Sequence, residues 1–139
     1  MRRVDELDSK GVRLATTTLH ANELRRKLVE VFELNEIEAE DEAARVIGFF
    51  DLVMPEAFEH LQSEAEARLS QGGKSDWPAL AAAMAFEGSI WSDDRDFFGV
   101  GVPVWASNNI GFVEAGIDRR LRSLPRPRRC GATTRTATV

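Results

Sequence analysis

Residues 74–109 read KSDWPALAAAMAFEGSIWSDDRDFFGVGVPVWASNN and carry the strongest indications of the fold. Asp76 precedes an almost wholly apolar segment, residues 79–86, which predicts a capped helix that is nearly all core. Two short runs rich in β-branched and aromatic side chains, residues 89–91 and 102–106, predict strands. An aspartate-rich loop separates them. The order of helix, strand, loop and strand indicates an α/β domain.

Outward from this stretch, strands and helices alternate along the chain. Helices are predicted over residues 4–10, 19–32, 38–50, 55–69 and 108–122, and further strands over residues 12–16 and 52–54. The helix over residues 19–32 is expected to bury a stripe formed by Leu19, Leu24, Leu28, Val31 and Phe32. The alternation predicts a parallel sheet flanked by helices on both faces, which is a three-layer α/β sandwich.

The composition is typical of an ordinary globular protein of one domain. A chain of 139 residues with 43% hydrophobic and 29% charged residues is too apolar for general disorder and short for two enzyme domains. No apolar run approaches the roughly 18 residues of a membrane span, and the N-terminus lacks a secretion segment, so we expect a cytoplasmic protein. The single cysteine and two histidines exclude a disulfide within the chain and a zinc site of several cysteines.

The net charge of −5 divides into two parts of opposite sign. Residues 119–139 contain seven arginines and no acidic residue. Residues 1–118 therefore contain the other 11 of the 18 basic residues and all 23 acidic residues. We expect residues 1–121 to form the domain and residues 122–139, which lack an apolar period, to be a disordered basic tail. The acidic domain is expected to repel nucleic acid, unless a bound cation or a local patch of basic residues reverses the electrostatic potential there.

Acidic residues gather where the predicted strands end, which is where parallel α/β folds bind ligands. They are Glu23 in the helix after the first strand, Asp76 at the apolar helix, and Asp93, Asp94 and Asp96 in the loop. Carboxylates at one point raise one another's pKa unless a cation lies among them. Oxygen ligands favour Mg²⁺ or Mn²⁺, which can activate water beside a phosphate, so the pattern indicates a phosphodiester substrate.

Each acid also has a purely structural interpretation, and the sequence leaves both open. Asp76 is a good helix N-cap, Glu23 fits a solvated helix charge, and the loop aspartates are common turn formers. His20 and His60 are interpreted as surface or edge residues, and the three tryptophans as core residues.

The opening stretch closely resembles the C-terminal half of PIN domains, the PilT N-terminus fold of metal-dependent ribonucleases. In that family an aspartate opens an alanine-rich helix, and a strand then ends in a Thr-Asn-Asp-like turn before an Asp-Phe pair. The matching positions are Asp76, residues 92–94, and Asp96 with the phenylalanine after it. Residues 14–28 resemble, less specifically, the family's second strand and the helix that bears its glutamate, which is Glu23 here.

The resemblance implies an Mg²⁺- or Mn²⁺-dependent endoribonuclease. Glu23, Asp76 and Asp94 would bind the metal and catalyse hydrolysis of RNA, with Asp96 as a supporting metal ligand and Asp93 as a neighbour. Many family members are toxins of toxin–antitoxin pairs. The implied partners are therefore RNA as substrate and an antitoxin protein, with a homodimer left open and no membrane involved.

The chain departs from the family at its N-terminus. Family members begin with a hydrophobic strand, central in the sheet, that carries an essential aspartate, and the residues before the first predicted strand lack this pattern. We expect a domain truncated at its N-terminus, through an upstream start or a gene remnant rather than a second chain that fills the slot. An unfilled slot would leave two strand edges unpaired. The alternative function is a non-catalytic PIN-like module that binds a protein partner or RNA.

Overall fold

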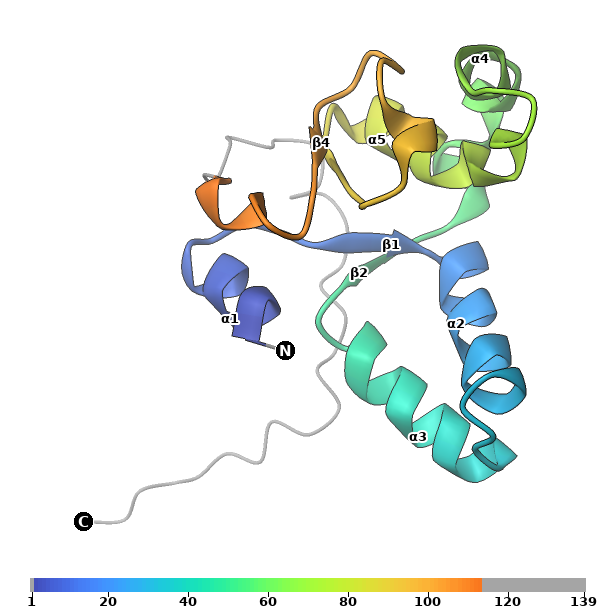
Figure 1. Cartoon of the computed structure of the whole chain (residues 1–139), viewed down its shortest axis with the longest axis vertical. Coiled ribbons are helices and arrows are strands. Elements are labelled where there is room, and N and C mark those ends of the chain that lie inside the picture. Colours follow the sequence, from blue (N-terminus) through green and yellow to red (C-terminus); the bar gives the residue numbers. More distant parts are fainter. Residues whose placement is uncertain (1, 114–139) are drawn as a thin grey trace.

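The computed structural model describes residues 2–113, which fold into helices and short parallel strands (Figure 1). The elements are α1 (Arg2–Ser9), β1 (Ala15–Thr17), α2 (Thr18–Glu30), α3 (Glu36–Ile47), β2 (Asp51–Val53), α4 (Gln62–Arg68), α5 (Trp77–Phe86), β3 (Ile90–Trp91) and β4 (Val104–Trp105). The predicted α/β class is confirmed, with small sheets of parallel strands. The tail expected at residues 122–139 lies outside the described residues.

The strands form two separate parallel pairs. β1 pairs with β2, with Ala15 opposite Asp51, and β3 pairs with β4, with Ile90 opposite Val104. No ladder joins the two pairs within residues 2–113. The first strand begins at residue 15 rather than 12, because the N–H of Val12 still donates to the Leu7 carbonyl at the end of α1. The predicted sheet is therefore present as two halves.

Two hydrophobic cores lie on opposite sides of β1 (Figure 1). The larger core gathers α4, α5 and β3 around Phe58 and Leu80, which are fully buried. Phe58 also packs against Trp77, with ring centroids 5.7 Å apart, which fits the core role expected for this tryptophan. The smaller core joins α2 to α3 through small and aliphatic side chains that include Leu28 and Ala43.

The predicted burial of the apolar stripe on α2 is wrong at both ends of the stripe. Leu19 is 44% exposed, and Val31 and Phe32 are 66% and 67% exposed. α2 packs mainly against α3, through Leu28 and the alanines of the smaller core, and this crossing leaves Leu19, Val31 and Phe32 largely uncovered by the described residues. The helix also ends at Glu30, before the last two positions of the stripe.

The segment predicted as one helix over residues 55–69 is divided. Two 3₁₀ turns, Pro55–Ala57 and Glu59–Leu61, precede α4. Phe58, Ala65 and Leu69 of this segment are nevertheless buried. Of the final helix predicted over residues 108–122, the described part contains only the 3₁₀ turn Ile110–Phe112.

Candidate metal centre

Asp76 stands at the N-terminal end of α5, as the last residue of the 3₁₀ turn Lys74–Asp76. The next residue but one is a proline, which is suited to the first helical turn because it needs no hydrogen-bond acceptor there. The Asp76 side chain accepts no capping hydrogen bond. Asp76 therefore occupies the N-cap position of α5, but its side chain does not accept a hydrogen bond from the backbone N–H groups of the first turn. Its carboxylate can instead contact a ligand.

Asp94 and Asp96 come from the turn that follows β3. Asp94 caps the 3₁₀ turn Arg95–Phe97, and its Oδ1 accepts a hydrogen bond from the Asp96 N–H over 2.9 Å. The N–H of Asp94 in turn donates to the Ser92 hydroxyl over 3.1 Å. Phe97 is 6% exposed and anchors the turn in the larger core. The loop aspartates are thus turn formers, as the structural interpretation holds, and one oxygen of Asp94 stays free of this turn.

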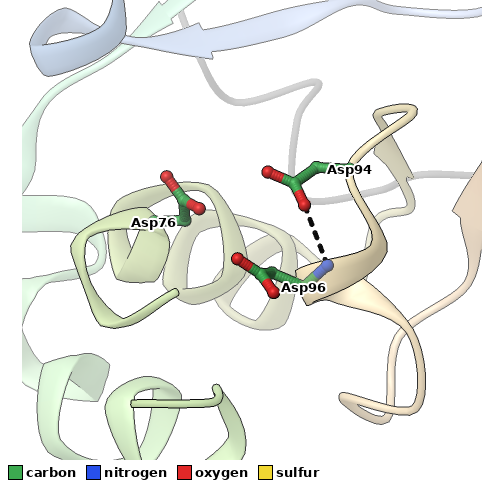
Figure 2. Close-up of side chains that lie close together, drawn as sticks. All are labelled: Asp76, Asp94 and Asp96. Carbon is green, nitrogen blue, oxygen red and sulfur yellow. Dashed lines mark hydrogen bonds between the residues drawn. The ribbon is translucent and has the colours of Figure 1, made fainter. Parts of the chain in front are cut away.

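The three carboxylates point toward one space between α5 and the turn (Figure 2). One oxygen from each of Asp76, Asp94 and Asp96 lies within 4.8 Å of the others. The pKa of Asp76 is raised, first because the residue is partly buried and next because Asp94 carries a negative charge beside it. No donor hydrogen-bonds to the Asp76 carboxylate within residues 2–113. Three carboxylate oxygens, one of them from the partly buried Asp76, are the kind of ligands that a divalent cation such as Mg²⁺ or Mn²⁺ prefers.

Glu23 lies near this cluster but is turned toward a lysine. Its negative charge contributes to the raised pKa of Asp76, so α2 brings it to the same end of the strands. Its carboxylate nevertheless pairs with Lys27 over 2.8 Å, and that hydrogen bond lowers the pKa of Glu23. The structure therefore places Glu23 beside the three aspartates without bringing it into the group.

The Asp93 carboxylate, unlike those of Asp94 and Asp96, makes hydrogen bonds to the chain after β4. Its carboxylate accepts hydrogen bonds from the Ser107 N–H over 2.7 Å and from the Ser107 hydroxyl over 2.6 Å. These bonds lower the pKa of Asp93. They join the loop after β3 to the chain that follows β4, and the Asp93 carboxylate is not one of the three that meet.

Two further residues shape the centre, and the sequence interpretation missed both. His20 is half-buried, its Nδ1 lies 2.7 Å from the Thr17 hydroxyl, and it acts on the pKa of Asp76. Gly73 lies so close to Asp96 that a Cβ atom on it would be 2.9 Å from Oδ2 of Asp96. The sequence position of His20 could have indicated its place in the site, because it lies in the first turn of the helix after β1, at the sheet edge where ligands bind.

The fold and this cluster define a class, namely an α/β protein with carboxylates gathered at the carboxyl ends of its strands. Comparison with known families then gives a match over residues 2–114 to the model described as PIN domain. The chain belongs to the PIN domain family. Nothing among the curated proteins or the solved structures matches it. PIN domains are generally dependent on divalent metals, and the family implies a nuclease role with RNA binding.

None of the helices within residues 2–113 has the length and apolar character that crossing a membrane requires.

Proposed function

We propose that this chain is a ribonuclease dependent on Mg²⁺ or Mn²⁺ that hydrolyses RNA phosphodiesters. The observation that carries the proposal is the meeting of Asp76, Asp94 and Asp96 within 4.8 Å. These three would hold the cation, with Glu23 as a further acidic residue beside them. A cation bound there would polarise a phosphate and lower the pKa of a bound water.

The contributions of the chain's own residues follow from their positions. The hydrogen bond to the Asp96 N–H orients Asp94, so its second oxygen is directed without a loss of side-chain freedom on binding. Partial burial of Asp76 reduces the screening of its carboxylate by water, which strengthens its attraction for a positive charge. His20 supplies a hydrogen-bonding ring near Asp76 and is the residue placed to orient a phosphate or a water there.

The test is RNA cleavage by the full chain with Mn²⁺, compared between the native protein, Asp94→Asn and Asp93→Asn. Asp94→Asn removes a charge from the cluster and is expected to abolish cleavage. Asp93→Asn makes the same chemical change at the adjacent residue, whose carboxylate accepts hydrogen bonds from Ser107, and is expected to retain cleavage once stability is matched. Metal-dependent cleavage that survives Asp94→Asn would refute the assignment.

A second candidate, a non-catalytic binding module, is favoured by the position of Glu23. Its carboxylate is engaged by Lys27, so fewer acids meet than the sequence pattern suggests. This candidate predicts binding of RNA without cleavage, with an affinity that falls steeply with salt and with removal of residues 119–139. A thermal shift with Mn²⁺ but no cleavage under any condition would favour it over the nuclease.

We also propose a protein partner of the antitoxin kind. Large apolar side chains are exposed around the turn between α2 and α3, and a surface of this kind marks a protein contact. They are Val29, Val31, Phe32 and Ile37, with exposed fractions of 39%, 66%, 67% and 77%. Phe32→Ser is expected to weaken such a complex and to leave cleavage by the free chain unchanged.

A further inference from the structure

The side chain of His20 lies near two acidic residues of the candidate metal centre. Burial and Asp94 raise the pKa of Asp76, and His20 acts in the opposite direction. The hydrogen bond from Lys27 lowers the pKa of Glu23, and His20 adds to this effect. The imidazole ring therefore lies within electrostatic range of both carboxylates, one at the start of α5 and one on its own helix.

One nitrogen of the ring is held by Thr17. Nδ1 of His20 lies 2.7 Å from the Thr17 hydroxyl oxygen, and the same oxygen accepts a hydrogen bond from the His20 backbone N–H over 3.2 Å. Thr17 is the N-cap of α2 and is 2% exposed, so the surrounding residues hold its side chain in place. The two contacts fix one end of the ring at the first turn of the helix.

These contacts determine which ring nitrogen carries the hydrogen. A threonine hydroxyl offers one hydrogen and two lone pairs. The Thr17 oxygen accepts from the His20 N–H, and the acceptor that its own hydrogen meets within residues 2–113 is Nδ1 of the ring. A buried donor left unpaired costs free energy, so the hydroxyl donates to Nδ1. A neutral imidazole has one acceptor and one donor nitrogen, and the ring hydrogen is therefore on Nε2.

The donor at Nε2 has no acceptor among the residues that the structure describes. No hydrogen bond joins Nε2 to any group of residues 2–113, although Asp76 and Glu23 are near. A nitrogen that carries hydrogen has no lone pair for a cation, and Mg²⁺ and Mn²⁺ prefer oxygen ligands. His20 is therefore unsuited to be a further metal ligand. Its half-buried ring presents a hydrogen-bond donor beside the three aspartates instead.

A phosphodiester supplies the acceptor that this donor lacks. A cation held by the aspartates would bind one phosphate oxygen, and the second non-bridging oxygen would still need a hydrogen-bond donor. A hydrogen bond to a charged oxygen is about twice as strong as one between neutral groups. A neutral imidazole provides this bond without a positive charge that would compete with the cation for the aspartates.

We propose that His20 is a substrate-binding residue whose Nε2–H donates to a non-bridging oxygen of the RNA phosphate, and that Thr17 is the positioning residue that holds the ring in this state. The proposal rests on the proposed ribonuclease function and adds to it the group that contacts the phosphate. The cation would then be bound by α5 and the turn after β3, and the phosphate would be oriented from α2.

The first experiment determines the state of the ring by NMR of the full chain, with ¹⁵N-labelled histidine in metal-free buffer at about pH 8, where imidazole is neutral. The His20 ring is expected to carry its hydrogen on Nε2 and none on Nδ1. Dimethyl phosphate, a phosphodiester probe, is then added with Mg²⁺ and should move the Nε2–H signal downfield, whereas Mg²⁺ alone should not. The exposed His60, on the turn Glu59–Leu61, is the internal control and should not respond.

The same signal tests the role of Thr17. Thr17→Ser keeps the hydroxyl and should preserve the Nε2–H signal and its response to dimethyl phosphate. Thr17→Val keeps the shape but not the hydroxyl, so the ring can rotate and the response should be lost. Asn35→Ala removes the N-cap of α3 and controls for the loss of a cap, and its response should match that of the native chain.

The second experiment measures kcat and KM for RNA cleavage with Mn²⁺ in two matched variants of His20. His20→Gln can place an amide N–H at the position of Nε2, whereas His20→Asn is shorter and reaches only the position of Nδ1. His20→Asn is expected to raise KM about tenfold, which is the effect of one lost hydrogen bond to a charged group. His20→Gln is expected to restore KM to within about threefold of the native value.

Four results would overturn the proposal. A hydrogen on Nδ1 would show that the ring is in the opposite state, and an Nε2–H signal that ignores dimethyl phosphate would show that this donor meets no phosphate. A lower kcat at constant KM in His20→Asn would assign the donor to the attacking water, and a weaker affinity for Mn²⁺ would assign it to a carboxylate ligand. Absence of cleavage by the native chain would refute the ribonuclease function alone, because the NMR readouts do not require cleavage.

Discussion

The carboxylate of Asp96 lies against Gly73, where a Cβ atom would come within 2.9 Å of it. Gly73 is buried, and its N–H donates to the Ser70 hydroxyl over 3.2 Å, so its backbone has little freedom to withdraw. The absence of a side chain at residue 73 thus permits Asp96 to reach Asp76.

Gly73→Ala is expected to displace Asp96 and to weaken Mn²⁺ binding by about tenfold, which corresponds to about 1.4 kcal/mol. Isothermal titration of the full chain with Mn²⁺ measures the change. Gly72→Ala is the matched control, since a Cβ there would meet nothing within 4 Å, and its Mn²⁺ affinity should equal that of the native chain. Equal affinities for all three proteins would show that the position of Asp96 is unimportant.

Lys27→Met is expected to strengthen Mn²⁺ binding roughly threefold, the size of effect that an exposed ion pair allows. The change releases Glu23 from its 2.8 Å pairing and preserves the propensity of α2 to be helical. Arg26→Met, which breaks a similar pair with Glu30, removes the same charge without freeing Glu23. Parallel titrations compare the two, and an identical gain in both variants would mean that net charge, rather than Glu23, is responsible.

The raised pKa of Asp76 makes stability depend on pH in a defined direction. The folded state binds the proton more tightly than the unfolded state, so Asp76 contributes most below its ordinary pKa of 3.8, and this contribution is lost as pH rises through the raised value. In metal-free buffer, the native chain should therefore gain stability relative to Asp76→Asn as pH falls through that value. Urea unfolding of both proteins across pH 4 to 8 is the measurement. A difference that shrinks on acidification contradicts the prediction.

The same proton should compete with the cation. Mn²⁺ affinity is expected to fall as pH decreases through the raised pKa of Asp76, because the ligand must be ionised to bind. The slope should be smaller in Asp76→Asn, which has no proton to lose at that residue. A native chain whose Mn²⁺ affinity is constant over this range would exclude Asp76 as a ligand.

Asp51→Ala is expected to destabilise the fold by about 3–5 kcal/mol, because it leaves a charge without its partner in a largely buried position. Arg13 and Asp51 have side-chain exposures of 18% and 9%, and they join the chain before β1 to the first residue of β2. Replacing both, as Arg13→Met with Asp51→Leu, should cost much less, since no lone charge remains. Chemical unfolding of the single and double variants tests this. A double variant as unstable as the single one would show that shape, not charge, matters at this pair.

The apolar helix α5 and the meeting of the three aspartates could be predicted from the sequence, because local patterns position each of them, while their role as metal ligands stays a prediction. An apolar helix, its N-terminal aspartate and a turn of aspartates after a strand each occupy a short stretch of chain. Their meeting follows from the rule that parallel strands present their carboxyl ends at one edge. The same reasoning does not distinguish Asp93 from Asp94, since the contact that holds Asp93 comes from Ser107, 14 residues further along the chain.

Other features escape sequence patterns because they depend on packing. Helical spacing assigns Val31 and Phe32 to a buried stripe, but only the crossing of α2 with α3 decides how much of that stripe is covered. Glu23 lies in the expected helix, yet its carboxylate pairs with Lys27, one helical turn further along, instead of joining the aspartates. Gly73 gives no signal in the sequence, because its importance lies in the approach of a side chain from residue 96.

The two cores also bear on how the molecule opens. α2 and α3 share a small core of five buried residues, and the larger core contains none of them. Such a hairpin can unfold locally while the remainder stays folded, at a free energy below that of global unfolding. Because Glu23 and His20 both belong to α2, this partial unfolding would carry them away from Asp76 and leave the other aspartates in place. Occupancy of the centre and closure of the hairpin would then be thermodynamically linked, so a bound cation would slow amide exchange throughout α2 and α3.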